Sequence, residues 1–131
     1  MNIKNGIAME PDFLLALQAL SSKEMTVEEC IELVSATKDV EQRIASLQEA
    51  RKALILKRCC KEKNGNIIFD KNTGDTTFPT PADKRLCEED LRKLADIDLE
   101  IKLSKKIALS KKDRLTPRKY FLLQDIIQVV D

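Results

Sequence analysis

The sequence predicts a mostly helical α+β domain with one long helix and a small antiparallel β-sheet. Three observations favour this class: residues 27 to 63 contain no proline or glycine, two threonine-proline pairs can begin helices, and two short β-prone segments flank a turn. The chain has 131 residues, of which 43% are hydrophobic and 34% are charged. Since this is the size of one ordinary domain, we expect residues 1–131 to share a single core.

The first predicted helix is short and amphipathic. Phe13, Leu14, Leu17 and Leu20 recur at steps of three and four, and the serines that follow end the pattern. Thr26-Val27-Glu28-Glu29 then forms a capping box. In this motif the threonine hydroxyl accepts a hydrogen bond from an unpaired amide of the new helix, and the Glu29 carboxylate accepts one from the amide of Thr26. A long helix is therefore expected to begin here.

The long helix is expected to run to about residue 63, which corresponds to roughly 55 Å at 1.5 Å per residue. A seam with coiled-coil-like spacing runs along this helix. It is made of Leu33, Thr37, Val40, Ile44, Leu47, Arg51 and Leu54. This seam indicates either packing within the chain or packing against a second copy. Asn64-Gly65 is a turn signal that ends the helix.

The predicted sheet has two parts. Residues 66–69 and 75–78 flank the turn at residues 71–74 and indicate a small hairpin. Residues 97–103 read IDLEIKL. Their apolar side chains would all point to one side on a strand but not on a helix, and the pattern resumes at Ile107 and Leu109. We therefore expect residues 97–109 to form a strand, or a bent pair of strands kinked at 104–106, that pairs with the hairpin.

Two further helices are predicted from their starts. Thr80-Pro81 provides a cap and a first helical proline for a helix to about residue 95. Thr116-Pro117 repeats this signal before a C-terminal helix that is expected to be buried in the chain's own core or in another subunit. Its apolar residues are Tyr120, Phe121, Leu123, Ile126, Ile127 and Val130.

The composition excludes several kinds of chemistry. The sequence contains no histidine, which removes Ser-His-Asp and Cys-His catalysis. Its four cysteines, Cys30, Cys59, Cys60 and Cys87, form no CxxC pair, so we expect reduced thiols and neither a metal nor another cofactor. The N-terminus lacks the pattern of a signal peptide and no apolar run is long enough for a membrane span, which favours the cytosol. A metal-dependent enzyme that uses the carboxylates of residues 88–100 is the weakest reading.

The charge is unevenly distributed although the formal net charge is only +1. Residues 1–50 carry four basic and nine acidic groups, residues 51–63 carry six basic and one acidic, and residues 102–119 carry eight basic and one acidic. Two interpretations remain open: a surface for anionic partners, or basic segments that pair with the acidic helices. The candidate binding residues are Arg51, Arg58, Lys105, Lys106, Lys111, Lys112, Arg114, Arg118 and Lys119.

The order of segments resembles an uncharacterised family of small bacteriophage and prophage proteins, a domain of unknown function. The resemblance is carried by ALQAL at residues 16–20, QEARKALILKRCCKEKNGNIIFD at 48–70, EEDLRKLADIDLEIKL at 88–103 and LTPRKYFLLQDII at 115–127. The adjacent cysteines and the very basic stretch before Thr116 depart from the family pattern. The resemblance implies a phage product made in the cytosol of a bacterial host, and it implies no catalytic residues.

Two functions are therefore expected to compete. The first is a non-enzymatic accessory protein that sequesters or inhibits a host component, either a host protein or a phosphate-bearing signalling nucleotide, as in anti-defence. The second is a homo-oligomeric component of a virion, a tail or its assembly. Self-association fits both functions, whereas sequence-specific nucleic-acid binding is not expected because the basic segments lack interleaved aromatic residues.

Overall fold

The computed structural model describes residues 1–130 and confirms a mostly helical α+β fold with one long helix. Its elements are, in chain order, β1 Asn2–Lys4, α1 Asn5–Ala8, α2 Phe13–Ala19, the 3₁₀ turn η1 Leu20–Ser22, α3 Val27–Leu56, α4 Pro81–Asp96, β2 Asp98–Glu100, β3 Ile107–Leu109, α5 Pro117–Leu123 and β4 Ile127–Val129.

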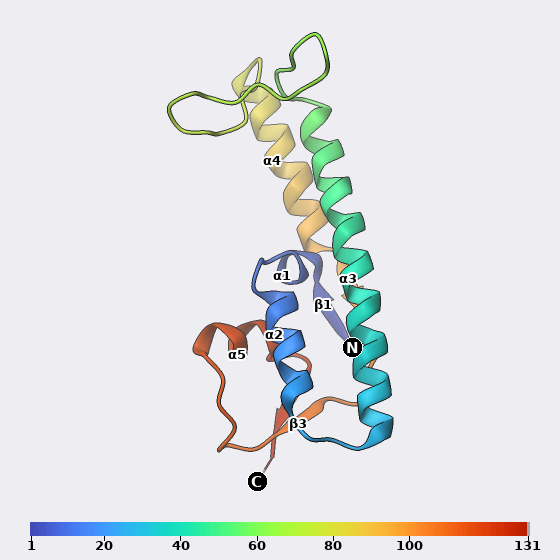
Figure 1. Cartoon of the computed structure of the whole chain (residues 1–131). Helices are drawn as coiled ribbons and strands as arrows, with labels where there is room; N and C mark the ends of the chain where they lie inside the picture. The colour runs from blue at the N-terminus through green and yellow to red at the C-terminus, as the bar shows by residue number, and fades with distance from the viewer. Residues whose placement is uncertain (131) are drawn as a thin grey trace.

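Helices α3 and α4 form an antiparallel hairpin that projects away from the other elements (Figure 1). Helix α3 has 30 residues, which gives a length of about 45 Å. It ends at Leu56, so the expectation that it continues to about residue 63 is wrong. The chain leaves the helix because the amide of Cys60 donates to the Thr77 carbonyl at 2.8 Å and so joins the loops beyond. We call residues 57–80 the tip.

The opposite end, which we call the globular end, contains α1, α2, the first half of α3, α5 and all four strands (Figure 1). Leu33 and Val40 of the α3 seam are buried there, and Ile44 and Leu47 pack against the same core. The seam is therefore used within the chain. The core consists of Ile3, Ala8, Phe13, Ala16, Leu17, Leu20, Leu33, Ala36, Val40, Leu99, Ile101, Ile107, Leu109, Leu122, Leu123, Ile126 and Ile127.

The strands form two separate pairs. Strand β1 pairs antiparallel with β2, with Ile3 opposite Leu99. Strand β3 pairs parallel with β4, with Ile107 opposite Ile127. Residues 97–109 thus supply two strands with a bend at 104–105, as expected, but their predicted pairing with residues 66–78 is wrong. That hairpin is closed by the Phe69–Thr76 bridge and lies at the tip, far from the globular end (Figure 1).

The C-terminal helix is shorter than predicted. Helix α5 ends at Leu123, and Ile127 belongs to β4 instead of continuing the helix. The amide of Ile107 donates to the Ile126 carbonyl at 2.9 Å, and the amide of Val130 donates to the Leu109 carbonyl at 2.7 Å. These bonds to β3 replace the bonds that another helical turn would have made.

The first eight residues form structure that the sequence did not predict. Asn5 is buried at 5% exposure, and its side-chain amide donates to the Leu94 carbonyl at 3.0 Å. A Cβ atom added at Gly6 would lie 3.1 Å from the Cβ of Ala95, which is a tight contact, so α1 approaches the end of α4 closely. This contact fixes the base of the hairpin on the globular end.

Candidate functional site

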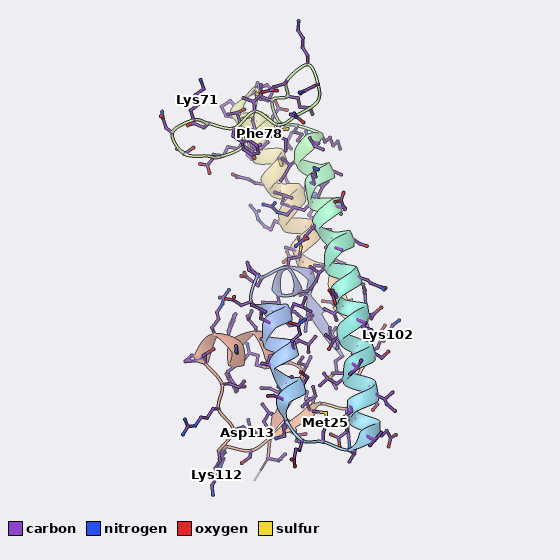
Figure 2. The ribbon with its side chains drawn as sticks, viewed as in Figure 1. Met25, Lys71, Phe78, Lys102, Lys112 and Asp113 are labelled. Carbon is purple, nitrogen blue, oxygen red and sulfur yellow. The ribbon has the colours of Figure 1, made fainter. Side chains whose placement is uncertain are left out.

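The nine candidate residues fall into two groups that the structure keeps apart. Arg51 lies on α3 about 36 Å along the axis from Val27, and Arg58 lies in the tip. The other seven belong to residues 105–119 at the globular end. Figure 2 shows this separation, with Lys71 at the tip and Lys112 at the other extreme of the molecule. The two basic segments therefore do not form one surface.

Arg58 is engaged with the neighbouring helix. Its Nε lies 3.6 Å from Oδ2 of Asp90 on α4, and both side chains are largely covered, at 23% and 27% exposure. The ion pair joins the start of the tip to α4. Arg58 is therefore a brace between the two arms of the hairpin and is poorly placed to bind an external anion.

Arg118 is also paired with carboxylates from the acidic N-terminal region. Its Nη2 lies 2.7 Å from Glu10 Oε2, and its Nε lies 3.6 Å from Asp12 Oδ2. These contacts hold the first turn of α5 against the segment that leads into α2. For this residue, pairing within the chain accounts for the charge.

Lys105 and Lys106 lie in the bend between β2 and β3, beside the first turns of α3. They line a small pocket together with Glu29 and Glu32. Glu32 also accepts hydrogen bonds from the amide and the hydroxyl of Ser104, the latter at 3.0 Å. The carboxylates of Glu29 and Glu32 therefore lie near these two lysines and offset part of their positive charge.

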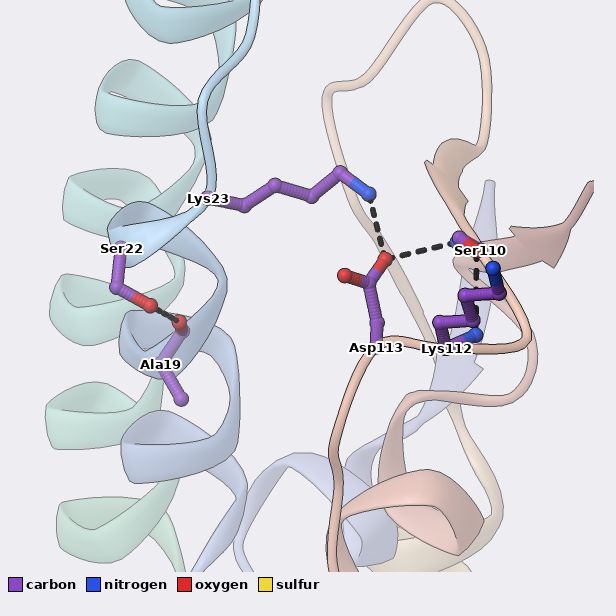
Figure 3. A network of polar contacts seen from close by, with 6 residues as sticks. All are labelled: Ala19, Ser22, Lys23, Ser110, Lys112 and Asp113. Atoms are coloured by element: carbon purple, nitrogen blue, oxygen red, sulfur yellow. Dashed lines mark hydrogen bonds and ion pairs between the residues drawn. The ribbon is translucent and has the colours of Figure 1, made fainter.

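The loop at residues 110–116, which we call the basic loop, is held by Asp113. Oδ2 of Asp113 accepts from Lys23 Nζ at 2.7 Å and from the Ser110 amide at 2.7 Å (Figure 3). The amide of Asp113 donates to the Ser110 carbonyl at 3.0 Å, and the amide of Lys112 donates to the Ser110 hydroxyl at 3.1 Å. Asp113 thus closes the turn and ties it to the segment between α2 and α3.

The electrostatics of Asp113 follow from these bonds. The hydrogen bond from Lys23, followed by that from the Ser110 amide, lowers the pKa of the Asp113 carboxyl below its ordinary value. Asp113 is also the sole acidic residue between positions 102 and 119. Since its charge is directed at Lys23, it offsets little of the positive charge on the rest of the loop.

Several cations of this region remain available. Among residues 1–130, no carboxylate forms an ion pair with Lys112, Arg114 or Lys119. Lys112 extends outward from the end of the molecule (Figure 2). Lys111 lies in the same loop. Lys112, Arg114 and Lys119 therefore form a group of positive charges that the described carboxylates leave unpaired.

Open grooves lie on both sides of the basic loop. One, of about 320 Å³, is lined by residues that include Leu20, Ser22, Lys23 and Arg114. The other, of about 280 Å³, is lined by residues that include Pro117, Tyr120 and Val129. Both grooves share Leu109 and Leu115. A partner that contacts the loop could therefore also cover apolar surface beside it.

Two features of this end were not anticipated. Lys23 was not a candidate residue, and no local pattern connects it with Asp113, which is 90 positions away. The outward face of the first turns of α3, where Val27, Ile31 and Val34 are exposed, was also missed. Here a signal existed, because these residues follow one another at steps of four and three, as on one helix face.

Within residues 1–130, no group of three or more metal-ligating side chains could hold an ion. Burial raises the pKa of the Cys87 thiol, which lowers its thiolate fraction. In the same part of the chain, no helix combines the length and apolarity that crossing a membrane requires.

No family model, curated protein or solved structure matches the chain.

Proposed function

We propose that this chain is a non-enzymatic binding protein that uses the basic loop and the start of α5 to recognise a negatively charged partner. The observation that carries the proposal is the position of Asp113, which turns inward to Lys23 while Lys112 and Arg114 remain without carboxylate partners in the described chain. In the setting that the resemblance to phage proteins implies, the partner is a host component that binding neutralises.

A fixed loop suits this role. Binding costs less conformational entropy when the contacting backbone is already ordered, and Asp113 supplies that order through Lys23 and Ser110. Lysine and arginine side chains attract carboxylates and phosphates alike. The grooves beside the loop add apolar contacts, including the ring of Tyr120, which is 49% exposed. The partner class is therefore an acidic protein surface or a phosphate-bearing small molecule.

The test is a pull-down from bacterial lysate with the double variant Lys112→Glu/Arg114→Glu. Proteins and nucleotides that co-purify with the tagged chain are identified by mass spectrometry. We expect a stoichiometric partner with the unmodified protein and a loss of at least tenfold with the variant. The matched control is Lys63→Glu/Lys71→Glu, which makes the same charge change at exposed positions in the tip. Retention of every partner by the loop variant would rule out this role for the basic loop.

The second candidate is a structural or assembly component, favoured by the projecting hairpin. The tip exposes Phe69 at 55% and Ile68 at 38%, well away from the core of the chain. Exposed apolar side chains at the end of a protruding element are typical of a contact with another protein. Recovery of the chain in purified phage particles, and its loss with Phe69→Ser, would favour this function.

A further inference from the structure

Helix α3 has two apolar faces at its N-terminal end. Leu33, Ala36 and Val40 are at most 3% exposed and contribute to the core. Val27, Ile31 and Val34 are 75%, 67% and 51% exposed. Because each helical residue turns by about 100°, Val34 and Ala36 point in nearly opposite directions. One face is therefore buried by the chain itself, and the other is left without a partner in the described chain.

The exposed face is a continuous strip. An open groove there is lined by Cys30, Ile31, Val34, Ser35 and Lys38. Figure 1 shows α3 along one edge of the molecule, with α1, α2, α5 and β3 on one side of it. Positions 27, 31, 34 and 38 are separated by alternating steps of four and three, which is the spacing of a coiled-coil seam. A second helix could therefore lie along the strip.

We propose that this strip, consisting of Val27, Cys30, Ile31, Val34 and Lys38, binds the same strip of a second copy in an antiparallel pair. The two-fold axis passes between Ile31 and Val34, so that Ile31 of each copy meets Val34 of the other. The same symmetry places Lys38 over Val27 of the second copy. The Lys38 stem then covers an apolar side chain, and its ammonium group reaches Glu28 of that copy.

The position of Lys38 favours this orientation. In a parallel pair, Lys38 would face Lys38, and these two charges repel. The antiparallel pair instead brings Lys38 near an opposite charge at both ends of the strip. Because only a few side chains are buried per copy, the interface is smaller than the roughly 800 Å² per partner of a standard complex. We therefore expect a weak dimer that forms between about 10 µM and 1 mM.

The arrangement also determines the shape of the dimer. With the axis between Ile31 and Val34, the two copies of α3 run in opposite directions, and their ends at Leu56 lie about 70 Å apart. The two tips therefore point away from each other. The basic loop is not involved, since Lys112 lies on the side of the globular end away from α3 (Figure 2).

Sedimentation equilibrium over this concentration range tests the dimer. The unmodified chain should pass from monomer to dimer, and Ile31→Glu/Val34→Glu should remain monomeric with an unchanged melting temperature, since both residues are exposed. The control Leu15→Glu/Ile97→Glu makes the same change at exposed apolar positions off the strip and should dimerise normally. A monomeric unmodified chain at about 1 mM, or normal dimerisation of the strip variant, would overturn the proposal.

A charge exchange tests the orientation. Lys38→Glu should weaken dimerisation at least fivefold, and Glu28→Lys added to it should restore most of the loss. A short bismaleimide should link the two Cys30 thiols, because the antiparallel pair offsets these residues by only about 7.5 Å along the helix axes. Absence of both the rescue and a Cys30-dependent cross-link would exclude the antiparallel pair. The two proposals can be told apart, since loop variants should leave the dimer intact and strip variants should leave partner capture intact.

Discussion

Asp113 shows how one side chain can order a loop that carries many like charges. Its carboxylate accepts from Lys23 and from the amide of Ser110, so two parts of the chain depend on its ionised form. The pKa of Asp113 is lowered by these bonds, with Lys23 the first cause. The unfolded chain therefore binds this proton more tightly than the folded chain does.

The consequence for pH is a small stabilising effect that is fully present above the ordinary aspartate pKa of about 3.9 and is lost as the pH falls through the lower folded value. A carbon-13 NMR titration of the Asp113 carboxyl should show a midpoint below the ordinary value. Lys23→Met should move the midpoint upward, and Lys112→Met, which removes a neighbouring charge but no hydrogen bond to this carboxylate, should change it little. An unmoved midpoint in Lys23→Met would contradict the assignment.

The four cysteines should differ in reactivity according to their burial. Cys30 is exposed, Cys60 is partly covered, and Cys59 and Cys87 are buried. The raised pKa of Cys87 further lowers its thiolate fraction. At low micromolar protein and pH 8, a disulfide reagent that releases a coloured thiolate should react quickly with Cys30, more slowly with Cys60, and with the buried pair only after unfolding. A fast phase that survives Cys30→Ser would contradict this order.

At the scale of elements, three threonine caps determine where helices begin. The hydroxyl oxygens of Thr26, Thr80 and Thr116 accept the amides of residues 29, 83 and 119 at 3.2, 3.1 and 3.2 Å. The threonine-proline pairs and the capping box predicted all three starts. One detail differs: Glu29 accepts from the Thr26 hydroxyl at 3.0 Å instead of accepting from the Thr26 amide.

Removal of the first cap should be measurable. Thr26→Ala is expected to lower the free energy of unfolding by about 1 kcal/mol, since an amide of α3 loses its acceptor. The control Ser35→Ala removes a hydroxyl from the exposed middle of the same helix and should change stability by less than about 0.5 kcal/mol. Urea denaturation of both variants gives the comparison. Equal stabilities would mean that the cap contributes nothing.

Helix starts and periodicity were readable from the sequence, whereas strand partners were not. The alternation in residues 97–109 correctly predicts that Leu99, Ile101, Ile107 and Leu109 are buried, although Ile97 is 56% exposed at the end of α4. The partners of β2 and β3 come from the two ends of the chain, and the pairing bonds are backbone bonds that leave no local signature. The hairpin at 66–78 was the one pairing partner that the sequence suggested, but α3 and α4 are so long that it lies far from β2 and β3.

The location of the candidate site was also predictable from the sequence, but the pairing of its charges was not. Counting charges located residues 105–119, but it could not separate the paired Arg118 from the unpaired Lys112. That distinction depends on Glu10 and Asp12, which approach only in the folded chain. Long-range contacts therefore decided which basic residues remain available to a partner.

At the scale of the whole molecule, the core lies almost entirely at the globular end. Phe13 is fully buried there, whereas Phe69 in the tip is 55% exposed. Phe13→Ala should therefore lower the free energy of unfolding by about 3–5 kcal/mol, and Phe69→Ala by less than about 0.5 kcal/mol. Chemical denaturation monitored by circular dichroism gives both values. Comparable losses for the two variants would show that the tip contributes to the common core.

The pairing of β1 with β2 has a consequence for synthesis on the ribosome. The N-terminal ammonium group donates to the carbonyl of Ile101, one hundred residues away, and β4 is translated later still. At about 10 residues per second, Ile3 and Phe13 wait roughly ten seconds for their partners. Helices α3 and α4 are joined by the tip alone and need no segment from either end of the chain, so they can associate first. The nascent chain therefore exposes an apolar N-terminal segment that is available to chaperones until β2 and β4 have been synthesised.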